Sequence, residues 1–323
     1  MKTTPTKYIH SRAAAIMLMI VAVCAAAARL SGTAVPQTPA TVFPPPDTWL
    51  APETVSFAVN IAANIAIAFT LLVINRTYRL MRSITWIFVG FFFFMQLAQP
   101  DALRYFSSGS FIALAVMLLT ALLFSTYASP AATRSTYLLF MLLALAALFQ
   151  YNIIFLMPVF ILGTIQMKIF DLRAILAIVM GIVTPLWILL GFGIIPPDSI
   201  SLPELRPVTP SADHSEYITG LVTTAFTGVI GLLFTFANLI KVMSYNSARR
   251  AFNGFITLLF LATLILIVAD HRNLPTYVPM LDIIVAYQAG HFFATRRYRL
   301  SYIPICVILA IYAAIAAIPI NIP

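Results

Sequence analysis

The polar and apolar positions of the chain divide it into eleven apolar segments separated by short polar breaks. A helix that crosses the hydrocarbon core of a bilayer, about 30 Å thick, needs roughly 17 to 25 mostly apolar residues. Long apolar runs without strand-like alternation are typical of helices, which satisfy their own backbone in lipid. We therefore predict an all-α fold, a polytopic transmembrane helical bundle of about 11 spans, with residues 1–323 forming one integral membrane domain. The expected spans are about 13–30, 55–74, 84–98, 109–127, 136–149, 153–167, 174–195, 218–240, 254–269, 278–294 and 301–318.

Basic residues are distributed unevenly between alternate breaks. The N-terminus and the breaks 75–83, 128–135, 168–173, 241–253 and 295–300 together hold fifteen lysines and arginines, whereas the other side holds only Arg29, Arg104, Arg206 and Arg272. Positive charge in short loops marks the cytoplasmic side of a membrane. The sequence therefore predicts the N-terminus inside and the C-terminus outside.

Two parts of this topology have alternatives. The fifth and sixth segments are short and only Gln150, Tyr151 and Asn152 separate them, so one long helix competes with two helices. The basic residues before and after the pair favour a chain that turns back, either by two full crossings or by a re-entrant hairpin broken near Pro158. Residues 1–30 also resemble a secretory signal peptide, whose removal would delete one span without reversing the others.

Composition restricts the classes of function. Hydrophobic residues make up 61% of the chain and charged residues only 9%, against about 25% charged residues in soluble domains. The net charge of +9 follows from the membrane-flanking loops, so we expect no nucleic-acid partner. The signatures of P-loop nucleotide hydrolysis, zinc proteases and serine hydrolases are missing from the sequence. We expect no cofactor and no metal, and we expect membrane lipids as partners; the pattern does not determine an oligomeric state.

Asp282 is the sharpest candidate for a functional residue. It is the one acidic residue within a predicted span, about one turn below the outer surface, and carboxylates inside membranes tend to be functional. The alternative is a residue that caps the start of the tenth helix after Pro279. His291 lies nine residues further on, which places it on the opposite face of the same helix.

A second candidate cluster lies on the outer side. Asp270, His271 and Arg272 are consecutive, and Asp101 and Arg104 join them if the loop between the third and fourth segments lies nearby. Acid, imidazole and guanidinium groups together suit proton transfer, with Asp101, Asp270 and His271 as candidates. Arg104 and Arg272 are candidates for binding an anionic headgroup. The alternative is a hydrated loop without a site.

Small and helix-breaking residues mark two further segments. In the eighth segment Gly220, Thr224 and Gly228 recur every four residues, with Gly231 close by, which favours close helix packing over the alternative of a polar pathway. In the seventh, glycines and Pro185 predict a kink or an unwound turn of the kind that lines some transporter sites.

Several short motifs carry a resemblance to a known group of proteins. They are Asn75-Arg76, Gln99-Pro100, Phe149-Gln150-Tyr151, Pro158, Asp171-Leu172-Arg173 and Gly181-Ile182-Val183-Thr184-Pro185. Over about residues 75–190, which hold these motifs, the chain resembles an uncharacterised family of bacterial multi-spanning inner-membrane proteins, a domain of unknown function. The resemblance implies a bacterial inner-membrane location and no activity or site residue.

Three classes of function fit these patterns. The leading expectation is a multi-pass inner-membrane protein that handles a lipid-linked or envelope-glycan substrate, using outer acidic residues such as Asp47, Glu53 or Asp101 beside a membrane groove. The first alternative is a secondary transporter or permease that uses Asp282 and a broken seventh helix. The second alternative is a non-catalytic membrane scaffold, which needs only helix packing.

Overall fold

The computed structural model describes residue 8 and residues 10–30, 42–50, 53–81, 86–99, 102–129, 132–195, 215–295 and 302–317. Regular structure within these residues is entirely helical, with eleven α-helices that each fall on one predicted segment. They are α2 (Arg12–Ala27), α3 (Glu53–Tyr78), α4 (Ile87–Ala98), α5 (Ser108–Ser125), α6 (Ala132–Phe149), α7 (Met157–Gln166), α8 (Leu172–Gly191), α9 (Ser215–Val242), α10 (Ser247–Ala269), α11 (Leu274–Thr295) and α12 (Tyr302–Ala317). Short 3-10 turns are η1 (Pro46–Thr48), η2 (Tyr151–Leu156) and η4 (His271–Asn273).

Six helices are long and apolar enough to cross a membrane: α3, α5, α6, α8, α9 and α10. Four shorter apolar stretches are α2, α4, residues 151–166 and α12. The prediction of an all-helical fold is therefore confirmed for the described residues, and several of the helices are long and apolar enough to cross a membrane.

Polar side chains fix where several helices begin. Asp171 accepts a hydrogen bond from the backbone N–H of Ala174 at 2.7 Å, and Asn246 accepts one from Arg249 at 3.1 Å. Such N-caps satisfy backbone donors that have no partner within the first turn. The helices α8 and α10 therefore begin at polar residues of the breaks that precede them.

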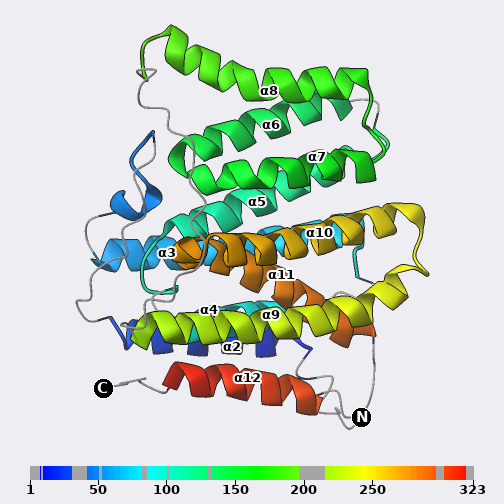
Figure 1. The fold of residues 1–323 in the computed structure, drawn as a ribbon. Coiled ribbons are helices and arrows are strands. Elements are labelled where there is room, and N and C mark those ends of the chain that lie inside the picture. Colours follow the sequence, from blue (N-terminus) through cyan, green and yellow to red (C-terminus); the bar gives the residue numbers. More distant parts are fainter. Residues whose placement is uncertain are drawn as a thin grey trace.

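The helices α3, α4 and α5 alternate in direction along the chain. At one level Asn60, near the start of α3, bonds to the Ala102 carbonyl just after α4 and to Ser110 near the start of α5. At the other level Tyr78, at the end of α3, packs against Phe124 near the end of α5. The axes of the helices run roughly parallel to one another in the bundle (Figure 1).

The helix α11 forms the centre of the bundle. It contacts α4, α5, α9 and α10, and all of its residues from Thr276 to His291 are buried. Every residue of α4 is also buried, including the four phenylalanines Phe91 to Phe94, so this run is packed inside the protein. A helix enclosed on all sides can carry polar residues that a lipid-facing helix cannot.

The chain turns back between α6 and α7, so the interpretation of one long helix is wrong. Gln150 has extended backbone angles, and the 3-10 turn η2 leads into α7. Pro158 lies in the first turn of α7, where a proline is tolerated, and does not break the arm.

The alternative of an unwound turn in the seventh segment is wrong. The helix α8 continues through Pro185 to Gly191, and it lies at the edge of the bundle against α6 (Figure 1). Gly181 allows this contact, since a Cβ atom there would lie 2.7 Å from the Tyr137 carbonyl oxygen. The outer face of α8 is apolar, with Trp187 exposed by 73%. Gly181 therefore serves the close packing of α8 against α6.

Close packing in the eighth segment is confirmed at Gly231. A Cβ atom on this residue would lie 2.7 Å from both the Phe260 ring and Val285 Cγ2. Gly231 thus lets α9 approach α10 and α11 at the same point.

Candidate functional site

Asp282 lies deep in α11. The helix begins at Leu274, eight residues earlier, which corresponds to about 12 Å along its axis. Pro279 also lies inside the helix, so Asp282 is more than one turn past the helix start and cannot cap it. The helix-cap interpretation is therefore wrong. The side chain is 0% exposed.

One donor reaches the Asp282 carboxylate. The Gln96 amide on α4 donates from Nε2 to Oδ2 of Asp282 at 2.8 Å. Within the part of the chain that the structure describes, Oδ1 of Asp282 and Oε1 of Gln96 have no hydrogen-bond partner, although both side chains are fully buried. Because an unpaired buried polar atom is expensive, this pair marks a site with an unmet requirement for a donor or a cation.

Two hydroxyl groups form a second buried polar contact between the helices that pack against α11 and α4. Thr227 of α9 and Tyr312 of α12 share a hydrogen bond of 2.9 Å, and both are 0% exposed. We call Gln96, Asp282, Thr227 and Tyr312 the Asp282 cluster; it comprises two separate hydrogen bonds, one between α4 and α11 and one between α9 and α12.

Two further buried polar contacts involve α9. Gln99, just after α4, donates to Thr224 of α9 at 3.1 Å. Nearer the other end of α9, Asn238 donates to the Gln288 side chain of α11 at 2.9 Å. The helix α9 therefore combines close packing at Gly231 with buried polar contacts to its neighbours, and the polar pathway stays a prediction.

His291 belongs to a separate network at the far end of α11. Its Nε2 lies 3.1 Å from the Tyr245 hydroxyl, and its ring stacks on Tyr287 with centroids 6.1 Å apart. Tyr287 donates to Oδ1 of Asn253 on α10 at 2.6 Å. His291 and Asp282 thus contact different partners, as their predicted positions on opposite faces require.

Asp270, one member of the candidate cluster predicted on the outer side, has a structural role. Both oxygens of Asp270 accept from the Asn273 amide at 2.9 Å, and Oδ2 also accepts from Tyr277 at 2.8 Å. These bonds hold η4 against the start of α11. His271 is buried beside it. Asp101 and the side chain of Arg272 lie outside the described residues, so their predicted place in this cluster is not observed.

Other outer charges bind backbone or cap helices. Arg104 donates to the Arg29 carbonyl, and Arg29 in turn donates to the Ala316 carbonyl at the end of α12. Asp47 accepts from the backbone N–H of Ser108 at 2.6 Å and from its hydroxyl at 3.0 Å. The contacts of these charges join loops and helix ends on the side that the sequence predicts to be outside.

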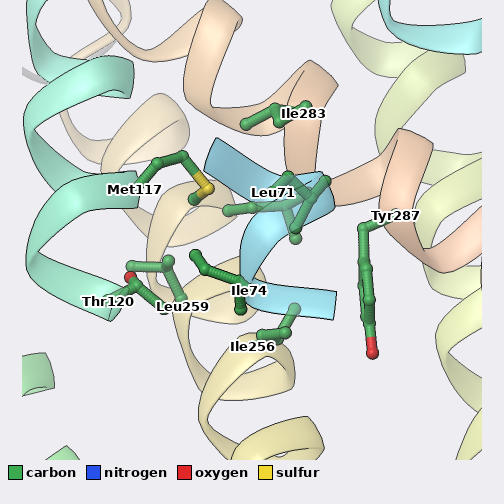
Figure 2. A pocket seen from close by; sticks show the side chains of 9 residues that line it. Leu71, Ile74, Met117, Thr120, Ile256, Leu259, Ile283 and Tyr287 are labelled. Atoms are coloured by element: carbon green, nitrogen blue, oxygen red, sulfur yellow. The ribbon is translucent and has the colours of Figure 1, made fainter. Parts of the chain in front are cut away.

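A small apolar pocket lies between α3, α5, α10 and α11, next to the Asp282 turn. Figure 2 shows its lining side chains, which include Leu71, Met117, Ile283 and Tyr287. The hydroxyl of Thr120 in its wall already donates to the Val116 carbonyl at 2.7 Å. The pocket offers no spare polar group and is too small for a substrate.

The sequence analysis missed Gln96 as a partner. A signal was present, because Gln96 is the single amide in the apolar run of α4 and such residues usually bond across helices. Which helix it faces is not encoded in that run. Among the described residues, no three His, Cys, Asp or Glu side chains are grouped so that they could hold a metal ion.

Comparison with models of protein families, with curated proteins and with solved structures finds no match in any of the three. The resemblance over residues 75–190 therefore stays a prediction. The arguments about function rest on the geometry of the chain itself.

Proposed function

We propose that the protein is a secondary transporter in which Asp282 binds the coupling cation. The observation that carries the proposal is a carboxyl group fully buried in the central helix, with one oxygen bonded by Gln96 and the other without a partner among the described residues. Charged or ionisable groups inside a membrane protein are costly, and they persist mainly where an ion or proton pathway needs them.

The surroundings of α11 support this proposal. Buried polar contacts lie on either side of the Asp282 cluster: Gln99, just after α4, donates to Thr224 of α9, and Asn238 of α9 donates to Gln288 of α11. The network around His291 lies beyond them, at the other end of α11. A transporter needs polar groups at successive depths of the membrane so that a bound ion can reach both sides.

The membrane location belongs to the same proposal. The protein crosses the bacterial inner membrane eleven times, with the N-terminus in the cytoplasm and the C-terminus outside. The division of basic residues and the two levels of helix ends support this topology. Apolar side chains on peripheral helices, such as Phe236 and Ile265, each 67% exposed, contact the acyl chains of membrane lipids.

Handling of a lipid-linked substrate, the leading expectation from sequence, is less well supported by the geometry. That activity needs outer cations that are available to phosphate and outer carboxylates beside a groove. Arg104 instead donates to a backbone carbonyl, Asp47 binds the start of α5, and Glu53 accepts from Tyr105 at 3.1 Å. The transport proposal needs none of these groups.

Reconstituted protein tests the proposal. The purified chain is placed in lipid vesicles that contain a pH-sensitive dye, and a panel of sugars, amino acids, organic anions and organic cations is added outside. We expect at least one solute to enter with the wild-type protein and to require a proton or sodium gradient. The variant Asp282→Asn should lose gradient-driven accumulation while its abundance in the membrane stays nearly unchanged.

Asp270→Asn is the matched control, because it removes the charge of the other fully buried carboxylate in the described residues. Asp270 is bonded by Asn273 and Tyr277 and has a structural place in the outer turn. We expect this variant to lose thermal stability but to keep the gradient dependence. Equal accumulation by the wild type and Asp282→Asn would refute the coupling role.

A further inference from the structure

The bond between Gln96 and Asp282 leaves a specific pair of atoms unsatisfied. The amide nitrogen of Gln96 donates to Oδ2, and the two atoms without a partner are the remaining oxygens of the same two groups, Oε1 and Oδ1. Both are acceptors. No rearrangement of existing hydrogens within the pair can satisfy them, because the missing element is a donor.

A carboxylic acid and a primary amide have complementary edges. If the acid carries a proton on Oδ1, that O–H can donate to Oε1 of the amide while the amide N–H donates to Oδ2. The result is a closed pair with two hydrogen bonds. One proton thereby satisfies both acceptors, each of which otherwise costs about 1–3 kcal/mol in a buried site. It also removes the charge, which would be expensive without a counter-ion.

We propose that the Gln96–Asp282 pair is a proton-binding site in which a single proton is held between Asp282 Oδ1 and Gln96 Oε1. Binding is a simple acid–base step: a proton from water joins the carboxylate, and its release restores the carboxylate. That this proton is the coupling cation rests on the proposed transport function. The presence of a proton at this pair does not depend on the transport function.

The oxygen atoms available at the site favour a proton over a metal ion. Hard metal cations such as magnesium or calcium take about six or more oxygen ligands. Within the described residues the pair offers two unpaired oxygens, one from each side chain. A single carboxylate with so few ligands suits one proton.

Infrared spectroscopy tests the inference directly. The full-length protein is purified in lipid at neutral pH, and the C=O stretch of protonated carboxyl groups is recorded in H₂O and D₂O. We expect a band that shifts on deuteration and disappears in Asp282→Asn. This variant should fold, because an amide in place of the acid can form the same two-bond pair. A wild-type spectrum without any band that depends on Asp282 would overturn the inference.

A residue exchange provides the control for the geometry. The double variant Gln96→Glu with Asp282→Asn swaps the acid and the amide while it keeps both side-chain lengths. We expect the protonated carboxyl band to return in the double variant, and we expect Gln96→Leu to shift the Asp282 band because the acceptor is gone. Failure of the double variant to restore the band would overturn the paired geometry.

The outcomes separate this inference from the proposed function. A band that depends on Asp282, together with solute accumulation that does not, leaves the proton site standing and refutes the coupling role. A missing band, with sodium chloride raising the thermal stability of the wild type but not of Asp282→Asn, refutes the proton and leaves a cation-coupled transporter.

Discussion

The contact at Gly231 allows a quantitative prediction about the packing around the central helix. Replacing Gly231 by alanine would place a Cβ atom 2.7 Å from the ring of Phe260 and from Val285 Cγ2. Optimal separations between carbon atoms are about 3.5–4.0 Å, so the new methyl group overlaps its neighbours by about 1 Å. Phe260 and Val285 are both 0% exposed and have no space into which they can move.

The expected magnitude follows from two opposing terms. Overpacking of a well-packed core costs typically about 1–3 kcal/mol, whereas glycine to alanine in a helix gains about 1 kcal/mol. The net loss of stability for Gly231→Ala is therefore about 0–2 kcal/mol, and we expect the upper part of this range because the new Cβ atom meets two fully buried side chains. In Gly228→Ala, one turn earlier, the Cβ atom would meet only the flexible end of Leu264 at 3.2 Å, so the two terms nearly cancel.

Thermal unfolding in detergent, followed by the loss of the monodisperse peak in size-exclusion chromatography, measures the difference. A loss of 1 kcal/mol lowers the midpoint by about 2–4 °C in domains of somewhat smaller size. Gly231→Ala should therefore unfold several degrees below Gly228→Ala. If the two variants unfold at the same temperature, the close approach of α9 to α10 and α11 at this point is wrong.

Three further predictions concern topology, the outer charges and a loop contact. Reporter fusions should place Pro323 outside and the loop 75–83 inside the cell, and a cytoplasmic signal at Pro323 would mean that one span is assigned wrongly. Arg104→Lys and Arg272→Lys should retain function when expressed in a strain that lacks the gene. Only the handling of a lipid-linked phosphate needs the bidentate hydrogen bonding of arginine, which lysine cannot provide. Accumulation of lipid-linked intermediates in either variant would restore the lipid-handling hypothesis. Asp47→Ala should lower the thermal midpoint through the loss of a cap worth about 0.5–2 kcal/mol, and an unchanged midpoint would show that this contact adds no stability.

The sequence by itself determined the elements of this protein. Each of the eleven apolar segments became one α-helix, because segment length and apolar composition are local properties that the bilayer selects directly. The turn between α6 and α7 was also predictable, since the basic residues on either side required the chain to return. The opposite faces of Asp282 and His291 followed from the helical repeat alone.

Only the tertiary structure decided how these elements are used. Pro185 and Pro279 both lie inside continuous helices, since neighbouring contacts stabilise a helix that an isolated proline would interrupt. Asp282 became the centre of a site because α4 brings Gln96 to it from 186 residues away in the sequence, a pairing that no local pattern encodes. The side chain of Arg104, by contrast, donates to the Arg29 backbone carbonyl. Carbonyl groups near a helix end have no partner within the helix, and the tertiary packing decides which donor reaches them.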